Sequence, residues 1–162
     1  MCRIVRTRTK AYLYLDPGNA RSLLTNPCLP RGNVPIPAKI LVVDDQQFVR
    51  RALRSLLVQQ PHWKVYEAAS GKAALESVRE IEPDVVVMDI MMPEMSGIET
   101  TYELRRLAPT TKVVLISSYY TPEEAAHLAR LFGDGNFIEK SATGQDLIPA
   151  ISRILPFESQ AV

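Results

Sequence analysis

Five polar residues of this chain each come directly after a short, mostly apolar run. They are three carboxylates, one hydroxyl and one ammonium: Asp44, Asp45, Asp89, Ser117 and Lys140. Carboxylate oxygens are typical Mg²⁺ ligands, and magnesium sites leave room for water and phosphate oxygens. A carboxylate can attack phosphorus to form an acyl phosphate, and a hydroxyl or an ammonium can contact the phosphoryl oxygens. The set therefore indicates a divalent cation and phosphoryl chemistry, provided that the fold brings the residues together.

Taken singly, these residues have simpler explanations. An aspartate after a strand often caps a helix, a serine there is usually a turn residue, and a lysine is usually a solvated cation. The combination, with every member at the end of a run, favours a shared site. Three carboxylates at close range would repel and raise one another's pKa values, and a bound cation would relieve this. Asp89 is then the natural nucleophile, with Lys140 and Ser117 placed to contact the transferred group.

The apolar runs have the composition of strands that are buried on both faces of a parallel sheet. They predict strands at about 39–43, 84–88, 112–116 and 136–139, and residues 63–67 are predicted to form a further short strand. Right-handed crossovers between parallel strands place helices on both faces, so the predicted fold is α/β, with a five-stranded parallel sheet. In open sheets of this kind, ligands bind just beyond the carboxyl ends of the strands, which is where the polar residues fall.

The segments between the strands carry helix signals. One segment has apolar side chains on a single helical face: Phe48, Val49, Ala52, Leu53, Leu56 and Leu57. A later segment is predicted to be helical around Ile98, Tyr102 and Leu104. Ser70 can cap a helix, and residues 121–124 have the spacing of a capping box with proline at the first helical position. Thr143 with Asp146 is predicted to open the last helix.

Charge and proline content divide the chain near residue 38. Residues 1–38 hold six basic side chains, one acidic side chain and five of the 12 prolines, without a helical period. We expect residues 1–38 to be a disordered N-terminal extension, 39–157 to be the folded domain and 158–162 to be a tail. The remainder, with 13 basic and 17 acidic side chains, is mildly acidic, which argues against direct nucleic-acid binding. No apolar run is long enough to span a membrane, and we expect a cytoplasmic protein.

Four stretches of the sequence resemble the receiver domain of two-component response regulators. They are KILVVDD at 39–45, PDVVVMDIMMPEMSGIE at 83–99, KVVLISS at 112–118 and GNFIEKSA at 135–142. The resemblance covers about 39–155 and implies a flavodoxin-like sheet with strand order 2-1-3-4-5. It also implies a phosphoacceptor switch rather than an enzyme, one that assists its own phosphorylation and dephosphorylation.

The resemblance assigns a role to each site residue. Asp89 would be the phosphoacceptor, and Mg²⁺ would be bound by Asp45, Asp89 and the backbone carbonyl of Met91, with Asp44 acting mostly through water. Ser117 would be the switch hydroxyl and Lys140 the lysine that binds the phosphoryl group. Phe137 matches the aromatic residue of the switch; as a residue on a strand it could equally be a plain core phenylalanine, and the two readings are compatible.

The resemblance also implies partners. A histidine kinase or a histidine phosphotransfer protein would donate the phosphoryl group, and an effector protein would respond to it; the sequence leaves dimerisation open. Ser141 follows the lysine where the family commonly has proline, so we expect a trans bond there. This makes the chain most similar to receivers of the LuxR/NarL-like class, which carry a DNA-binding domain after the receiver. Only seven residues follow Leu155, so we expect no such domain.

Other functions are possible on the same fold. The main alternative is a protein-interaction module that does not use phosphorylation, although such receivers usually lack one of the five polar residues. A hydrolase of the haloacid dehalogenase type would need Asp-x-Asp after the first strand, where this chain has Asp44-Asp45-Gln46. A flavin carrier would need a phosphate loop there, and two aspartates would repel a phosphate.

Overall fold

The computed structural model describes residues 37–134 and 136–155. These residues belong to one compact unit, Pro37–Pro156. Nearly all of the predicted N-terminal extension and all of the predicted tail lie outside the described residues. Within those residues, no helix has the length and apolar character needed to cross a bilayer.

The unit contains a five-stranded sheet with every strand pair parallel. Its strands are β1 Ala38–Val43, β2 Trp63–Ala68, β3 Val85–Asp89, β4 Lys112–Ser117 and β5 Phe137–Glu139. Their spatial order is β2-β1-β3-β4-β5, which confirms the order implied by the resemblance. The predicted strands agree with these within a residue or two, because continuous apolar runs between polar ends leave little freedom for a buried parallel strand.

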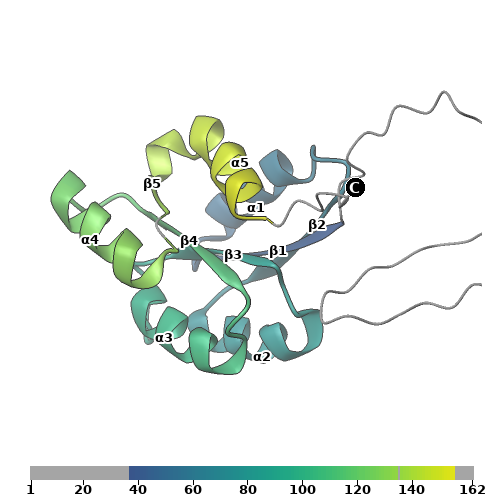
Figure 1. The fold of residues 1–162 in the computed structure, drawn as a ribbon, viewed down its shortest axis with the longest axis horizontal. Helices are drawn as coiled ribbons and strands as arrows, with labels where there is room; N and C mark the ends of the chain where they lie inside the picture. Colours follow the sequence, from purple (N-terminus) through teal and green to yellow (C-terminus); the bar gives the residue numbers. More distant parts are fainter. Residues whose placement is uncertain (1–36, 135, 156–162) are drawn as a thin grey trace, which may run out of the picture. The chain divides into compact units, whose positions relative to one another are not determined.

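Helices follow each strand and cover both faces of the sheet. They are α1 Gln47–Leu57, α2 Gly71–Ile81, α3 Gly97–Leu107, α4 Pro122–Phe132 and α5 Thr143–Ile154. Figure 1 shows α1 and α5 on one face, and α2, α3 and α4 on the other. Alternate residues of β1 point to opposite faces, so Ile40 and Val42 join the core under α1 and α5 while Leu41 and Val43 join the other.

Side chains at three helix starts satisfy free backbone N–H groups. The Ser70 hydroxyl accepts a hydrogen bond from the Ala73 amide at 3.2 Å. The Thr121–Glu124 capping box is present as predicted, with Pro122 in the first turn of α4. A second capping box, which the sequence analysis did not predict, joins Ser96 and Glu99 at the start of α3. Each box fixes where its helix begins relative to the strand before it.

The last helix starts where the sequence predicts, but no side chain caps it. It begins at Thr143, whose hydroxyl donates to the carbonyl of Lys140 at 2.8 Å. A short 3₁₀ turn, Lys140–Ala142, precedes α5 and places Ala142 at the N-cap position. A capping residue usually has an extended backbone, but the residue before α5 already has a helical backbone because it belongs to the 3₁₀ turn. The described residues contain no cis peptide bond, so the bond before Ser141 is trans as expected.

Three residues predicted on apolar helix faces are instead exposed: Phe48, Ala52 and Tyr102. Phe48 of α1 is 82% exposed, while Leu53 and Leu57 of the same helix are buried. Tyr102 of α3 is also largely exposed, while Leu104 is buried. The predicted helical period is correct, but the face of each helix that contacts the sheet is narrower than its stripe of apolar side chains. Phe48 lies in the first turn of α1, close to the edge of the sheet where the polar residues gather.

Asp134, in the loop before β5, holds that loop to β4 and α3. Asp134 has a positive φ of 47° and accepts a hydrogen bond from the Val113 amide at 2.9 Å. Its carboxylate also lies 3.6 Å from Arg105 and 3.5 Å from Lys112. These contacts join α3, β4 and the loop, and all three partners lie away from the strand ends that carry the polar residues.

Candidate functional site

The carboxyl ends of β1 and β3 bring the three aspartates together. One carboxylate oxygen from each of Asp44, Asp45 and Asp89 lies within 4.8 Å of the others, and this is the one such group among the described residues. Asp44 and Asp89 are buried, and Asp45 is more accessible. The order of the sheet explains the convergence, since β1 and β3 are hydrogen-bonded neighbours.

Lys140 lies between two of the carboxylates. Its Nζ is 2.7 Å from Asp44 Oδ2 and 2.8 Å from Asp89 Oδ2. Asp44 Oδ1 also accepts a hydrogen bond from the Gln46 amide at 2.8 Å, and Asp89 Oδ1 accepts one from the Met91 amide at 3.3 Å. Lysine is a compact point charge that can serve two acceptors at once, which suits this position.

The buried charges shift one another's proton affinities. Burial raises the pKa of Asp89; the hydrogen bond and charge of Lys140 oppose the rise, and the charge of Asp44 adds to it. Burial lowers the pKa of Lys140, but its hydrogen bonds and ion pairs with Asp44 and Asp89 outweigh this, and the net pKa is raised. The surroundings therefore favour the charged form of Lys140 and disfavour the charged form of Asp89.

Two oxygens at the site have neither a hydrogen-bond partner nor an ion-pair partner in the described part of the chain. They are Asp45 Oδ1 and Ser117 Oγ, and both are buried. Buried polar atoms normally have partners, so an unpaired oxygen beside a carboxylate cluster is consistent with a ligand that completes the site. The donor set of hard oxygens fits a divalent cation such as those that proteins bind with carboxylates.

The position of Asp89 is fixed by the close approach of α3. Gly97, the first residue of α3, has no room for a side chain, because a Cβ atom there would overlap the carbonyl oxygen of Asp89. The Gly97 amide donates to the carbonyl of Ile90 at 2.9 Å. The loop between them therefore folds back tightly on the end of β3, and only glycine permits it.

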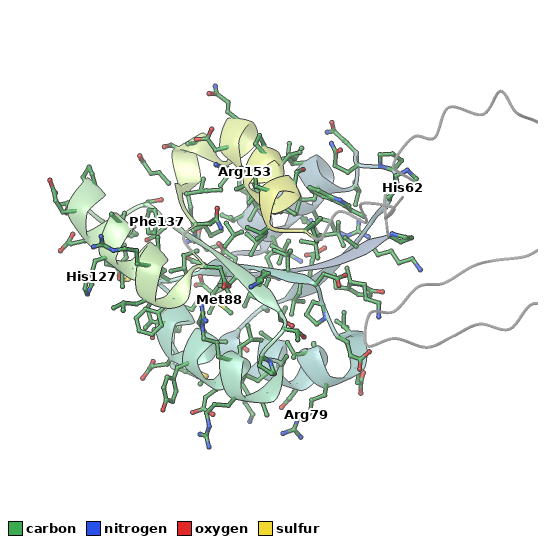
Figure 2. The ribbon with its side chains drawn as sticks, viewed as in Figure 1. His62, Arg79, Met88, His127, Phe137 and Arg153 are labelled. Atoms are coloured by element: carbon green, nitrogen blue, oxygen red, sulfur yellow. The ribbon has the colours of Figure 1, made fainter. Side chains whose placement is uncertain are left out.

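Phe137, the predicted aromatic residue of the switch, lies on β5 next to α4 (Figure 2). It is half-buried, and its ring meets that of Tyr120 edge to face, with ring centres 6.2 Å apart. The Tyr120 hydroxyl in turn donates to Met91 Sδ at 3.8 Å. Tyr120 thus connects the loop after Asp89 with β5, a link that the sequence analysis did not predict.

The two tyrosines after β4 differ in their surroundings. Tyr119 is 79% exposed, whereas Tyr120 packs as described. His62 and His127 are exposed residues on different parts of the unit, and Figure 2 shows them well apart. Neither belongs to the acidic group.

Comparison with known proteins gives the family. Residues 40–152 match the sequence profile of the response regulator receiver domain. The chain belongs to this family. This match confirms the resemblance noted from the sequence motifs. The receiver fold of two-component response regulators is confirmed as well. Membership of this family is consistent with phosphorelay signalling.

Individual relatives support this assignment. The receiver is 35% identical over 125 residues to response regulator protein VraR of Staphylococcus saprophyticus, covering 76% of this chain and 59% of that protein. The chain thus spans less than two thirds of the length of this relative. Among solved structures, it resembles the receiver domain of the putative response regulator NarL from Mycobacterium tuberculosis, with a TM-score of 0.66, 29% identity and coverage of 74% and 96% of the two chains. A LuxR-family response regulator from Aurantimonas sp. also has a TM-score of 0.66, with 30% identity and coverage of 72% and 84%.

Proposed function

We propose that this receiver accepts a phosphoryl group on Asp89 and signals by a change of conformation. The observation that carries the proposal is the arrangement around Asp89. Its buried carboxylate contacts the Lys140 ammonium at 2.8 Å and lies in a group with Asp44 and Asp45. The donor is a histidine kinase or a histidine phosphotransfer protein, and the recipient of the signal is an effector protein.

Mg²⁺ is the cation that suits the site, because it prefers one or two carboxylates and keeps positions for phosphate oxygens and water. Asp45, Asp89 and the backbone carbonyl of Met91 would hold it directly, and Asp44 through water. When bound, the ion supplies positive charge that offsets the carboxylates and the phosphoryl oxygens. The unpaired Asp45 Oδ1 supports this assignment.

Asp89, Lys140 and Ser117 each have a separate role in the phosphoryl transfer. A carboxylate oxygen of Asp89 forms a bond to phosphorus while the bond from phosphorus to the donor's imidazole nitrogen breaks, and the imidazole leaves with the electron pair of that bond. Lys140 lies where it can offset charge on the phosphoryl oxygens. The Ser117 hydroxyl, which has no partner among the described residues, would donate to one of those oxygens. Water attack on the acyl phosphate later returns Asp89 to its carboxylate form.

The signal would leave the site through Ser117 and Phe137. Movement of the Ser117 hydroxyl toward the phosphoryl group draws the end of β4 inward, and the Phe137 ring follows into the space beside α4. The contact between Phe137 and Tyr120 supports such coupling, since a shift of the loop after β4 must move one ring against the other. The surface around α4 and β5 would then change for a partner protein.

Intact-mass measurement after incubation with acetyl phosphate tests this function. We expect one phosphoryl group on the wild type in the presence of Mg²⁺, and none on Asp89→Asn or when the metal is removed with a chelator. Absence of the phosphoryl group under every condition would contradict the proposal. It would favour the interaction module that does not use phosphorylation.

A further inference from the structure

Arg50 reaches from α1 back to the loop that carries the acidic pair. Its Nη1 donates to the carbonyl of Asp44 at 2.8 Å and to the carbonyl of Asp45 at 3.1 Å. Both carbonyls belong to the loop that follows β1. The next carbonyl along the chain, that of Gln46, accepts a hydrogen bond from the Arg50 amide in the first turn of α1. Arg50 therefore serves a stretch of backbone between two regular elements.

The guanidinium is anchored from the opposite side by β2. Arg50 Nε lies 3.7 Å from Glu67 Oε2, and the Arg50 side chain is only 12% exposed. Arg54, one helical turn further along α1, lies with its Nε 3.2 Å from the other oxygen of Glu67. Arg54 is much more exposed, and the described structure records no contact between it and the loop. The planar fork of arginine allows one side chain to bind both the carboxylate and the backbone, which lysine cannot match.

The two aspartates depend on this support to different degrees. The Asp44 carboxylate is fixed independently, by the Gln46 amide at 2.8 Å and by Lys140 at 2.7 Å. The Asp45 carboxylate has a buried oxygen with no hydrogen-bond partner among the described residues. The direction of the Asp45 side chain must then follow from its backbone, whose carbonyl Arg50 holds.

We propose that Arg50 is a positioning residue for the divalent-cation site, acting through the backbone of Asp45. The inference rests on the magnesium site of the proposed function. Groups that orient metal ligands typically change metal affinity by about 10–100-fold when they are removed. Because the remaining contacts of Asp44 survive, we expect a loss of about tenfold in Arg50→Met, at the lower end of that range.

The sign of the effect separates positioning from simple electrostatics. Arg50 is a positive charge close to a cation site, so its removal would strengthen cation binding if charge alone mattered. Loss of positioning weakens binding instead. Arg54→Met is a matched control, because it removes a neighbouring positive charge and an ion pair with the same Glu67 while leaving the loop contacts intact.

The test is Mn²⁺ binding to the full chain, measured by the electron paramagnetic resonance signal of the free ion. We expect Arg50→Met to bind about tenfold more weakly than the wild type, Arg50→Lys to recover part of the loss, and Arg54→Met to stay within about twofold. Unchanged or tighter binding in Arg50→Met would overturn the proposal, as would an equal loss in Arg54→Met. If Arg50→Met does not fold, the comparison of Arg50→Lys with Arg54→Met decides in the same way.

A second measurement does not depend on metal or phosphorylation. NMR order parameters of the metal-free protein should fall at the Asp45 and Gln46 amides in Arg50→Met, and stay unchanged at Met91 and Ser117. Order that is unaltered at Asp45 would overturn the positioning role. If the wild type binds Mn²⁺ but accepts no phosphoryl group, the proposed function is contradicted, while weaker Mn²⁺ binding in Arg50→Met would still support the role of Arg50. A wild type that binds no Mn²⁺ would overturn both.

Discussion

Gly97 and Gly144 both lie in the first turn of a helix, yet the structure predicts opposite results when each is replaced by alanine. At Gly97 the new Cβ would overlap the Asp89 carbonyl oxygen and lie 2.9 Å from the Cα of Ile90. At Gly144, in α5, the new Cβ would have no heavy atom within 4 Å apart from its chain neighbours and the nearby backbone of its own helix. Gly144→Ala is thus a matched control for Gly97→Ala.

The magnitudes follow from two opposing effects. Alanine is favoured over glycine inside a helix by about 0.5–1 kcal/mol, and Gly144→Ala should gain up to that amount. Overpacking typically costs about 1–3 kcal/mol, and the overlap at Gly97 is with backbone atoms, which have no rotamer to change. The cost should lie near the upper end of that range, so we expect Gly97→Ala to lose about 2 kcal/mol of stability overall.

Urea unfolding at pH 7, followed by circular dichroism and by the fluorescence of the single tryptophan, Trp63, measures both changes. The phosphorylation rate with acetyl phosphate gives a second result. Gly97→Ala should be slower because α3 must move away from the end of β3, and Gly144→Ala should match the wild type. Equal stability and equal rates in the two variants would refute the reasoning that the close approach of α3 positions Asp89.

Three further predictions concern the cation, the loop contact and a helix cap. Mg²⁺ at 100 times its dissociation constant should raise the free energy of unfolding by about 2.7 kcal/mol, and thermal unfolding of Asp45→Ala should show most of this gain lost. Tyr120→Phe, which removes only the hydroxyl contact with Met91, should cost less stability in urea than Tyr120→Ala, which also loses an edge-to-face contact worth about 0.5–1.5 kcal/mol. Thr121→Ala should cost about 1 kcal/mol at pH 7. Glu124 contributes separately: the hydrogen bonds that its carboxylate accepts from the Thr121 backbone amide and then from the Thr121 hydroxyl lower its pKa, so the Glu124 contribution is present above the ordinary glutamate pKa and is lost as pH falls through the folded value. A pH titration of stability that is parallel in Glu124→Gln and the wild type would contradict this.

Much of the fold and the convergence of the site could be predicted because both depend on local patterns. Runs such as Val85–Met88 can hardly be anything but buried strands, and a polar residue at the end of each run must lie at the same edge of a parallel sheet. The Thr121 capping box was predictable for the same reason, since all its members lie within four residues.

The remaining features depend on contacts that residue spacing does not specify. The exposure of Phe48 follows from how far α1 extends past the sheet, and the helical period alone does not give that. The 3₁₀ turn that precedes α5 is likewise not specified by the spacing of Thr143 and Asp146. The contacts of Tyr120 with Met91 and of Arg50 with Glu67 join segments that are far apart in sequence or depend on rotamers, so no local signal predicts them.

The central claim is that Asp89 itself carries the phosphoryl group, and chemical mapping tests it most directly. Borohydride reduction converts an aspartyl phosphate to homoserine, which peptide mass spectrometry can locate in protein that has been treated with acetyl phosphate and Mg²⁺. We predict homoserine at position 89 and aspartate retained at Asp44 and Asp45. Homoserine at either of those two positions, or at none of the three, would contradict the account.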